Sequence, residues 1–295
     1  MKKNVIETIK LSLSCHLPGS LNLKIYKNLK SLKLETRQAQ RNIENHKEQN
    51  IEIQNKLINF CLRELIGALR IFHCKDVGMK RFGTRGDGGY ILLNDLRSTD
   101  FLISGGLGDN IAFEMEVADQ VSEVVAIDHT VPNLKSNHKN LQINHMKLSS
   151  ESETGSITLS DLLQQNHASD YLLKLDIEGD EWSILDNLTR TEIKKFRQIA
   201  VEFHWLHGDN SFQHFEKIRN TFNKLNYSHA VIAVSANNWG SIRQIAGISI
   251  PDVIEVTFVR KSNYHLEQSN EILYSHLQFP NNKNLPPIEN DWLFQ

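Results

Sequence analysis

The densest group of ionisable side chains lies in the stretch LDIEGDE, which places four carboxylates within six residues. Asp180 and Glu181 have a structural explanation, because acids in the first turn of a helix are stabilised by its positive end. Asp176 and Glu178 directly follow an apolar run, and residues two apart on a strand point to the same face. Such a pair needs a cation, a proton or a substrate to balance its charge. We therefore predict that Asp176 and Glu178 belong to a functional site.

A second polar pair, Glu202 and His204, has the same two-residue spacing at the end of another apolar run. Histidine can accept a proton near neutral pH, and an alcohol hydroxyl must lose its proton as it attacks a methyl group. We predict that His204 is a general base and that Asp176, Glu178 and Glu202 complete the catalytic set. The four side chains also offer ligands for Mg²⁺. We expect a site without a metal and keep Mg²⁺ as the alternative.

A glycine-rich turn, SGGLGDN, follows an apolar run, and the next apolar run ends at Asp128. This order is typical of half of a nucleotide-binding fold, which takes either a dinucleotide or S-adenosylmethionine. Gly106 and Gly108 match the first two glycines of G-x-G-x-x-G, but Ile111 stands at the third position. Asp109 would repel a pyrophosphate, so the turn favours a cationic sulfonium. The cofactor-binding residues predicted from these strand ends are Gly105, Gly106, Gly108, Asp109, Asp128 and Asp176.

A parallel sheet is required to bring these residues together, because working residues gather at the carboxyl ends of its strands. The sequence alternates apolar runs of strand length with helical patterns. No helical pattern separates the last two runs, so we expect them to pair as a hairpin, an ending typical of methyltransferases and not of dehydrogenases. The predicted fold class is α/β, a doubly wound Rossmann-like sheet of seven strands with a helical N-terminal extension. Strands are predicted at 101–103, 124–127, 141–148, 199–203, 231–234 and 253–259, helices at 110–120, 131–139, 158–165 and 211–225, and a strand that runs into a helix over 171–185.

Composition limits the classes of partner. A net charge of −2 over 295 residues argues against a general nucleic-acid binder, because counterion release needs a basic face. Residues 1–50, however, hold ten Lys/Arg and four Asp/Glu, a surplus of +6. We predict that this basic arm is a solvated helical extension; the alternatives are self-association into a homo-oligomer and peripheral contact with an acidic membrane surface. Three cysteines without disulfide or metal-ligand spacing, and no membrane-spanning apolar run, lead us to expect a cytoplasmic protein.

From about Arg81 to Lys261 the sequence resembles FkbM-type S-adenosylmethionine-dependent methyltransferases. The main match is LLKLDIEGDEWSIL, which fits the family's K-x-D-x-E-G-x-E-x-x-x-L; ISGGLGDN, VVAIDHT and ITLSDLL support it. RFGTRGDGGYIL and VEFHWL are similar to a subset with a D-G-G-Y hairpin before the first strand and E-F-H at the fifth. The resemblance implies methyl transfer to hydroxyl groups, often of sugars. It also implies that the glycine turn and Asp128 hold the cofactor, with Asp176 and Glu178 near the reacting centre.

The chain departs from the family pattern at the glycine turn, where members often have an acid-x-Gly and this chain has Ser-Gly-Gly. Asp109 or Asp87 is therefore expected to contact the methionine end of the cofactor. The turn Asp87-Gly88-Gly89 by itself predicts a hairpin, and a lid over the cofactor is the alternative.

We therefore predict an S-adenosylmethionine-dependent O-methyltransferase that acts on a small molecule or glycan, such as a surface-polysaccharide precursor, and not on nucleic acid. The expected organisation is a basic helical extension (1–75), a methyltransferase domain (76–262) and an irregular C-terminal tail (263–295). Two alternatives are a nicotinamide-dependent oxidoreductase and a non-catalytic scaffold that retains the fold.

Overall fold

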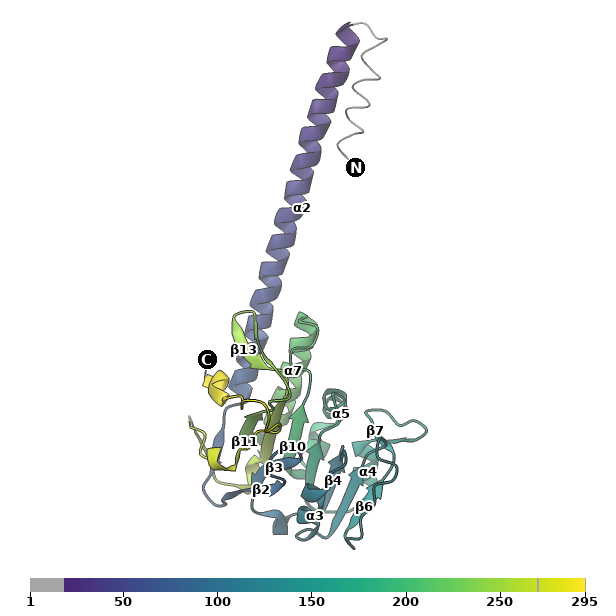
Figure 1. The fold of residues 1–295 in the computed structure, drawn as a ribbon, viewed down its shortest axis with the longest axis vertical. Coiled ribbons are helices and arrows are strands. Elements are labelled where there is room, and N and C mark those ends of the chain that lie inside the picture. Colours follow the sequence, from purple (N-terminus) through teal and green to yellow (C-terminus); the bar gives the residue numbers. More distant parts are fainter. Residues whose placement is uncertain (1–18, 270, 295) are drawn as a thin grey trace. The chain divides into compact units, whose positions relative to one another are not determined.

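A computed structural model describes residues 19–269 and 271–294, without the side chains of 19–26. The chain divides into two compact units, Met1–Asn55 and Lys56–Gln295. Helix α2 (Gly19–Ala68) begins in the first unit and ends in the second (Figure 1). Among the described residues, no helix is long and apolar enough to cross a bilayer.

A seven-stranded sheet forms the centre of the second unit (Figure 1). Neighbouring strands are parallel except at β14, which runs antiparallel to both β10 and β11. This arrangement confirms the predicted doubly wound sheet and the pairing of its last two strands. The chain order reverses between β4 and β9, and ligands of such sheets bind outside the strand ends at that point. In spatial order the strands are β11 (His229–Ala236), β14 (Ile254–Arg260), β10 (Phe196–Phe203), β9 (Tyr171–Leu175), β4 (Phe101–Gly105), β5 (Glu123–Ile127) and β6 (Leu141–Asn144).

Apolar layers cover both faces of this sheet. On one face, Leu102 and Leu172 pack in a cluster with α3; on the other, Ile103 and Leu173 pack with α4, α5, α6, α7 and the end of α2. Because the central strands are buried on both faces, they read as continuous apolar runs and not as alternating ones. The helices are α3 (Ala112–Ala118), α4 (Leu159–Gln165), α5 (Glu181–Asn187), α6 (Arg190–Ile193) and α7 (Phe212–Asn226).

Four two-stranded sheets and four 3₁₀ helices complete the described structure. The sheets are β1 (Phe72–Cys74) with β15 (Leu266–Gln268), β2 (Met79–Gly83) with β3 (Gly89–Leu93), β7 (Lys147–Leu148) with β8 (Ser156–Ile157), and β12 (Ile242–Ile245) with β13 (Ile248–Pro251). The 3₁₀ helices are η1 (Leu96–Ser98), η2 (Lys261–Asn263), η3 (Ser275–Leu277) and η4 (Asn290–Phe294). The β2–β3 pair confirms the hairpin predicted at Asp87-Gly88-Gly89.

Two predicted elements are wrong. Residues 131–139 form no helix, and only the bond from the Leu134 N–H to the Val131 carbonyl marks a turn there. The segment has too few apolar positions to offset the cost of starting a helix. The predicted strand at 141–148 is divided, because its neighbour β5 ends at Ile127 and pairs only as far as Asn144. Beyond that point the chain leaves the central sheet and forms β7.

The ends of the second unit pack on its core. Leu62 and Leu65 of α2 are buried, as are Tyr274 and Trp292 in the C-terminal segment. The Tyr274 hydroxyl accepts from the Val234 N–H and donates to its carbonyl. The three-part division into 1–75, 76–262 and 263–295 stays a prediction.

Candidate active site

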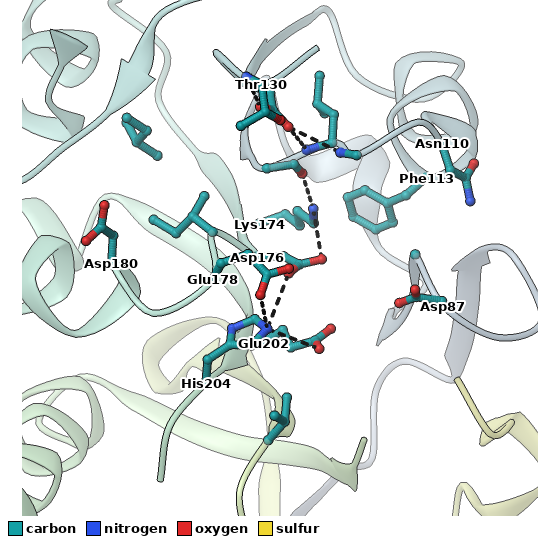
Figure 2. Close-up of a pocket in the computed structure, with 18 of the residues that line it drawn as sticks. Asp87, Asn110, Phe113, Thr130, Lys174, Asp176, Glu178, Asp180, Glu202 and His204 are labelled. Carbon is teal, nitrogen blue, oxygen red and sulfur yellow. Dashed lines mark hydrogen bonds and ion pairs between the residues drawn. The ribbon is translucent and has the colours of Figure 1, made fainter. Parts of the chain in front are cut away.

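A cavity of about 760 Å³ lies at the carboxyl ends of the parallel strands (Figure 2). Its wall comes from the turn after β4, the ends of β5, β9 and β10, the β2–β3 hairpin and the loop after β11. The volume falls within the range of small-molecule sites, about 300–1,000 Å³. All the residues predicted for the site line this cavity except Gly105. The lining residues among those predictions are Asp87, Gly106, Gly108, Asp109, Asp128, Asp176, Glu178, Glu202 and His204.

The imidazole of His204 lies among three of the predicted acids (Figure 2). Its Nε2 is 3.9 Å from Asp176 Oδ1, 3.6 Å from Glu178 Oε2 and 3.6 Å from Glu202 Oε1. The ring and Glu202 are buried, whereas the Glu178 side chain is largely exposed. The structure therefore brings together the whole predicted catalytic set at one ring nitrogen.

The other ring nitrogen of His204 contacts Glu181, which the sequence explains only as an acid at a helix start. Glu181 is fully buried, and its Oε1 is 3.1 Å from His204 Nδ1. Its two oxygens also accept from the backbone N–H groups of Ile177 at 2.7 Å and Gly179 at 3.0 Å. A carboxylate only accepts, so Nδ1 carries the proton, and Nε2 of the neutral ring is free to accept one. Glu181 is therefore a site residue that sequence reasoning missed.

The protonation of His204 reflects this surrounding of acids. Burial lowers the pKa of the ring, but the hydrogen bond and charge of Glu181, together with the charges of Asp176 and Glu178, outweigh it. The pKa of His204 is therefore raised above its ordinary value of 6.5. The surrounding acids stabilise the imidazolium, so they make the His204 ring a stronger proton acceptor.

Glu178 reaches His204 for a reason other than the one predicted. Strand β9 ends at Leu175, so Glu178 is not two places from Asp176 on a strand. It lies in a turn with φ of 58°, followed by Gly179 with φ of 113°. A side chain on Gly179 would come within 2.6 Å of the Trp205 ring, whose Nε1 donates to the Glu178 carbonyl at 3.1 Å. The glycine of the E-G motif is therefore required by its conformation and by Trp205.

Glu202 is a buried carboxyl group with one oxygen left without a protein partner. Its Oε1 accepts from the Asn237 side chain at 2.6 Å, whereas Oε2 has no hydrogen-bond partner. Burial raises its pKa well above the ordinary value, and the charges of Asp176 and Glu255 add to the effect. Glu255, its neighbour on β14, has a pKa raised to about 7 by burial. The ionised form of Glu202 is therefore disfavoured at this position.

Asp176 is held by two residues that sequence reasoning did not select. Its Oδ2 accepts from the Tyr90 hydroxyl at 2.8 Å and lies 3.6 Å from Lys174 Nζ. Lys174 is buried, donates to the Gly106 carbonyl, and lies with Nζ 5.4 Å from the centre of the Tyr90 ring. The lysine of the K-x-D motif therefore connects the glycine turn to the acid, and Tyr90 of the hairpin orients that acid.

The three glycines of the turn have different roles. A side chain on Gly106, whose φ is 79°, would meet the Asp176 carbonyl at 1.6 Å. One on Gly105 would meet Leu148 at 2.6 Å, so Gly105 serves packing between β4 and its surroundings and does not line the cavity. Gly108 has φ of 56° but open space around it. Close packing against Leu148 thus explains Gly105, the close approach of the Asp176 backbone explains Gly106, and at Gly108 the space is open.

Asp128 is already occupied by donors of the protein. Its Oδ2 accepts from the N–H groups of Leu107 at 2.8 Å and Gly108 at 3.2 Å, and its Oδ1 accepts from the Thr130 N–H and hydroxyl. Burial raises the pKa of Asp128, but these hydrogen bonds, those of Thr130 foremost, lower it overall. A carboxylate has about four acceptor sites. A ligand hydroxyl must therefore displace one donor, and the Thr130 hydroxyl is the one free to rotate.

Two features bear on what the cavity can bind. Trp205 and Trp239 both line it and are more than half exposed, at 57% and 63%. Asp176, Glu202 and His204 offer ligand atoms within 4.8 Å of one another, a spacing at which they could hold a metal ion. Lys174 near Asp176 already neutralises part of this charge. The expectation of a metal-free site stays a prediction.

Comparisons with known proteins identify the class to which this cavity belongs. A family model described as the methyltransferase FkbM domain matches residues 77–228, more than half of the chain. No curated protein matches. The match includes the β2–β3 hairpin, the glycine turn, the K-x-D motif and His204.

Solved structures give a weaker likeness. ErmE, a 23S rRNA methyltransferase, is 11% identical with a TM-score of 0.34, over 59% of this chain and 66% of that one. SMU.1697c, a putative methyltransferase from Streptococcus mutans in complex with SAH, is 11% identical with a TM-score of 0.32, over 56% of this chain and 91% of that one. NodS, an N-methyltransferase from Bradyrhizobium japonicum, is 10% identical with a TM-score of 0.31, over 55% and 85%. Likeness this low carries no argument about the acceptor.

Proposed function

The chain belongs to the FkbM methyltransferase family, and from this membership we propose that it transfers a methyl group from S-adenosylmethionine to a hydroxyl group. The proposed acceptor is a sugar hydroxyl, in a small molecule or in a glycan such as a surface-polysaccharide precursor. The observation that carries the proposal is the pairing of His204 Nδ1 with Glu181, which leaves Nε2 as the proton acceptor in the cavity. Transfer to a hydroxyl needs such a group.

The lining of the cavity suits a cationic cofactor. Asp87, Asp109 and Asp176 contribute negative charge, and buried Glu114 has an oxygen, Oε2, without a hydrogen-bond partner. When bound, S-adenosylmethionine supplies a methyl group on a positively charged sulfur. We assign the ribose to Asp128, where it would take the place of the Thr130 hydroxyl, with Gly106 and Gly108 along its path. The amino group of the methionine end would meet Asp87 or Asp109.

The proposed role of His204 is to take the proton of the acceptor hydroxyl on Nε2. Glu181 stabilises the imidazolium that forms and fixes the orientation of the ring, because it is itself held by two backbone N–H groups. Glu202 Oε2, which has no hydrogen-bond partner, is open to a contact with the acceptor. Asp176 and Glu178 complete the polar contacts. Much of the rate enhancement in such a site comes from holding the reacting groups in line.

A sugar is supported by the aromatic side chains on the acceptor side of the cavity. Trp205 follows β10, and Trp239 lies on the loop after β11. Both residues are more than half exposed, and an exposed indole packs well against the C–H face of a pyranose while polar groups nearby bind its hydroxyls. The backbone N–H of Trp239 donates to Asn237 Oδ1 at 2.9 Å, which ties this part of the loop to Asn237. Asn237 in turn donates to Glu202.

Two experiments test the proposal in order. Calorimetry with S-adenosylmethionine and its demethylated product should show binding; a folded sample that gives no heat with either would defeat the proposal. Transfer of a labelled methyl group to fractionated cell glycans should then depend on His204. We expect His204→Gln to lower the rate by about 10²–10⁴-fold, the range for a general base, with cofactor affinity retained.

The matched control is His138→Gln, because His138 is bonded to Asp119 away from the cavity. This variant should transfer at the wild-type rate. Label found in a protein or an RNA, and removed from it by neither glycosidase treatment nor lipid extraction, would refute the sugar acceptor. Methyl transfer itself would still stand.

A further inference from the structure

Helix α2 carries a long apolar stripe with a repeat of seven residues. Eight large apolar side chains in the described part of α2 are exposed to solvent. Six of them lie at positions of a repeat whose steps along the sequence alternate between three and four residues. We call the positions of this repeat the heptad stripe. Its first set, the a positions, is Leu29, Thr36, Ile43, Asn50 and Leu57, and its second set, the d positions, is Leu32, Ala39, His46, Ile53 and Phe60.

The stripe is without cover from Leu29 to Leu57, whereas its last position, Phe60, lies with its ring centre 5.8 Å from the Arg219 guanidinium. Every described side chain from 27 to 57 is exposed, so this part of α2 gains no stability from burial. Isolated helices are marginal in water, and most of their stability in proteins comes from packing an apolar face. A helical pattern that runs far beyond 25 residues is typical of coiled coils. From 29 to 60 the stripe spans roughly 48 Å at 1.5 Å per residue.

The repeat selects a helix as the partner. A seven-residue repeat of 3.5-residue spacing keeps one narrow seam facing another helix that has the same repeat. Polar residues occur within it, which a lipid surface would not favour. The Thr36 hydroxyl is already satisfied by the Leu32 carbonyl at 2.7 Å. Asn50 has no such local partner in the repeat, and an asparagine at an a position typically pairs with its counterpart in a two-stranded coiled coil.

A second copy of this chain supplies that partner without further assumptions. In a parallel pair in register, Asn50 faces Asn50 and each e position faces the g position of the preceding heptad. These flanking pairs are Asn28 with Lys33, Glu35 with Gln40, Asn42 with Lys47, and Gln49 with Gln54. No pair places like charges together, so nothing at the edges of the seam opposes association. We propose that α2 forms a parallel, two-stranded coiled coil with α2 of a second copy of this chain.

The sharpest test uses two pairs of residues that differ in phase alone. Leu32 and Ile53 lie on the stripe and are 58% and 54% exposed; Leu34 and Ile51 lie off it and are 65% and 61% exposed. Leu32→Lys/Ile53→Lys and Leu34→Lys/Ile51→Lys remove the same side chains and add the same charge. Light scattering of the full chain over a range of concentrations should give twice 33.9 kDa for the wild type. The off-stripe variant should match it.

The on-stripe variant should dissociate. Each of its two lysines should raise the dimer dissociation constant at least tenfold, so the two together should raise it about 100-fold or more. A wild type that stays monomeric at 100 µM (about the highest practical concentration) would overturn the proposal. So would a trimer or tetramer, or equal effects of the two variants. A monomer that sediments with vesicles of anionic phospholipid would overturn it in favour of a membrane surface.

Orientation is tested by cross-linking. In a chain with Cys15→Ser, Ala39→Cys places a thiol at a d position, where identical residues face each other only in a parallel, in-register pair. Gln38→Cys is the control, because position 38 points away from the seam. We expect an added oxidant to join the Ala39→Cys chains and to leave the Gln38→Cys chains separate. The opposite pattern, or no cross-link in a dimeric sample, would overturn the parallel arrangement.

Discussion

Replacing Glu181 by glutamine tests whether this residue positions His204 or only starts a helix. The carboxylate accepts three N–H groups, from Ile177, Gly179 and His204. An amide has one accepting oxygen, so Glu181→Gln must either turn its NH₂ towards a backbone N–H or donate to His204 Nδ1. In the second case the ring proton moves to Nε2, and the ring can no longer accept a proton in the cavity.

The expected loss of stability follows from the buried N–H group that Glu181→Gln leaves without an acceptor. A buried donor left without a partner costs about 1–3 kcal/mol, so Glu181→Gln should lower the free energy of unfolding by that amount. The matched control is Asp180→Asn, in the same turn but half-buried and paired with Lys147 at 2.9 Å. Loss of a charge at a helix start costs only about 0.3–1 kcal/mol. If Glu181 acted only on the helix, the two variants would be alike.

The pKa of His204 determines how the stability difference between wild type and Glu181→Gln should change with pH. With Glu181 neutral, burial is opposed only by the more distant acids, so the pKa of His204 should fall below its wild-type value. A raised histidine pKa stabilises the folded state below the ordinary value of 6.5, and this contribution is lost as pH rises through the folded-state pKa. The stability difference between wild type and Glu181→Gln should therefore be larger at pH 5.5 (below about 6.5) than at pH 9.

The assay needs no acceptor. NMR titration of the His204 ring reports its pKa, and urea unfolding at the two pH values reports stability. Asp180→Asn should leave the His204 titration unchanged. A Glu181→Gln variant whose His204 titrates as in the wild type, or at higher pH, would refute the assigned contact. So would a cost in stability no greater than that of Asp180→Asn at both pH values.

Three further predictions concern the turn, the buried acid and the metal. Gly106→Ala should lower the free energy of unfolding by about 4 kcal/mol or more, since its side chain would meet a backbone carbonyl, whereas Gly108→Ala should cost only about 1–2 kcal/mol for its left-handed conformation; urea unfolding compares them, and equal costs would contradict the assignment. Glu202→Gln should gain stability relative to wild type as pH rises above about 4.5, because the raised pKa of the wild-type carboxyl makes its ionisation unfavourable in the folded state. The same difference in unfolding free energy between the two proteins at about pH 5 and about pH 8 would contradict this prediction. An excess of EDTA should leave methyl transfer unchanged; loss of activity that Mn²⁺ or Mg²⁺ restores would instead assign an ion to Asp176, Glu202 and His204.

Much of the fold could be predicted because burial on both faces leaves a direct trace in the sequence. The runs at 101–103, 124–127, 171–175 and 199–203 all lie in central strands of the sheet. The β12–β13 hairpin left no such trace. Its turn is Ala246-Gly247, with φ values of 48° and 84°, and alanine is not a residue that signals this conformation.

The sequence indicated most residues that line the candidate site, but not always the geometry that brings them there. Strand ends selected Asp176, Glu178, Glu202 and His204, and these do line one cavity. Glu178 arrives there through a left-handed turn and not through strand alternation. Glu181 could not be selected, because an acid at a helix start needs no further explanation. The arm is a separate case: it was expected to be a solvated extension, and its association is a proposal.

The sequence by itself determined which side chains can do chemistry and on which strand ends they stand, because local patterns of apolar residues, glycines and acids act over a few positions. It did not determine what each acid faces. Glu181 and His204 are 23 residues apart, and Tyr90 and Asp176 are 86 apart. Such contacts exist only once strands from distant parts of the chain are packed, and burial then sets hydrogen bonds and pKa values that no local pattern contains.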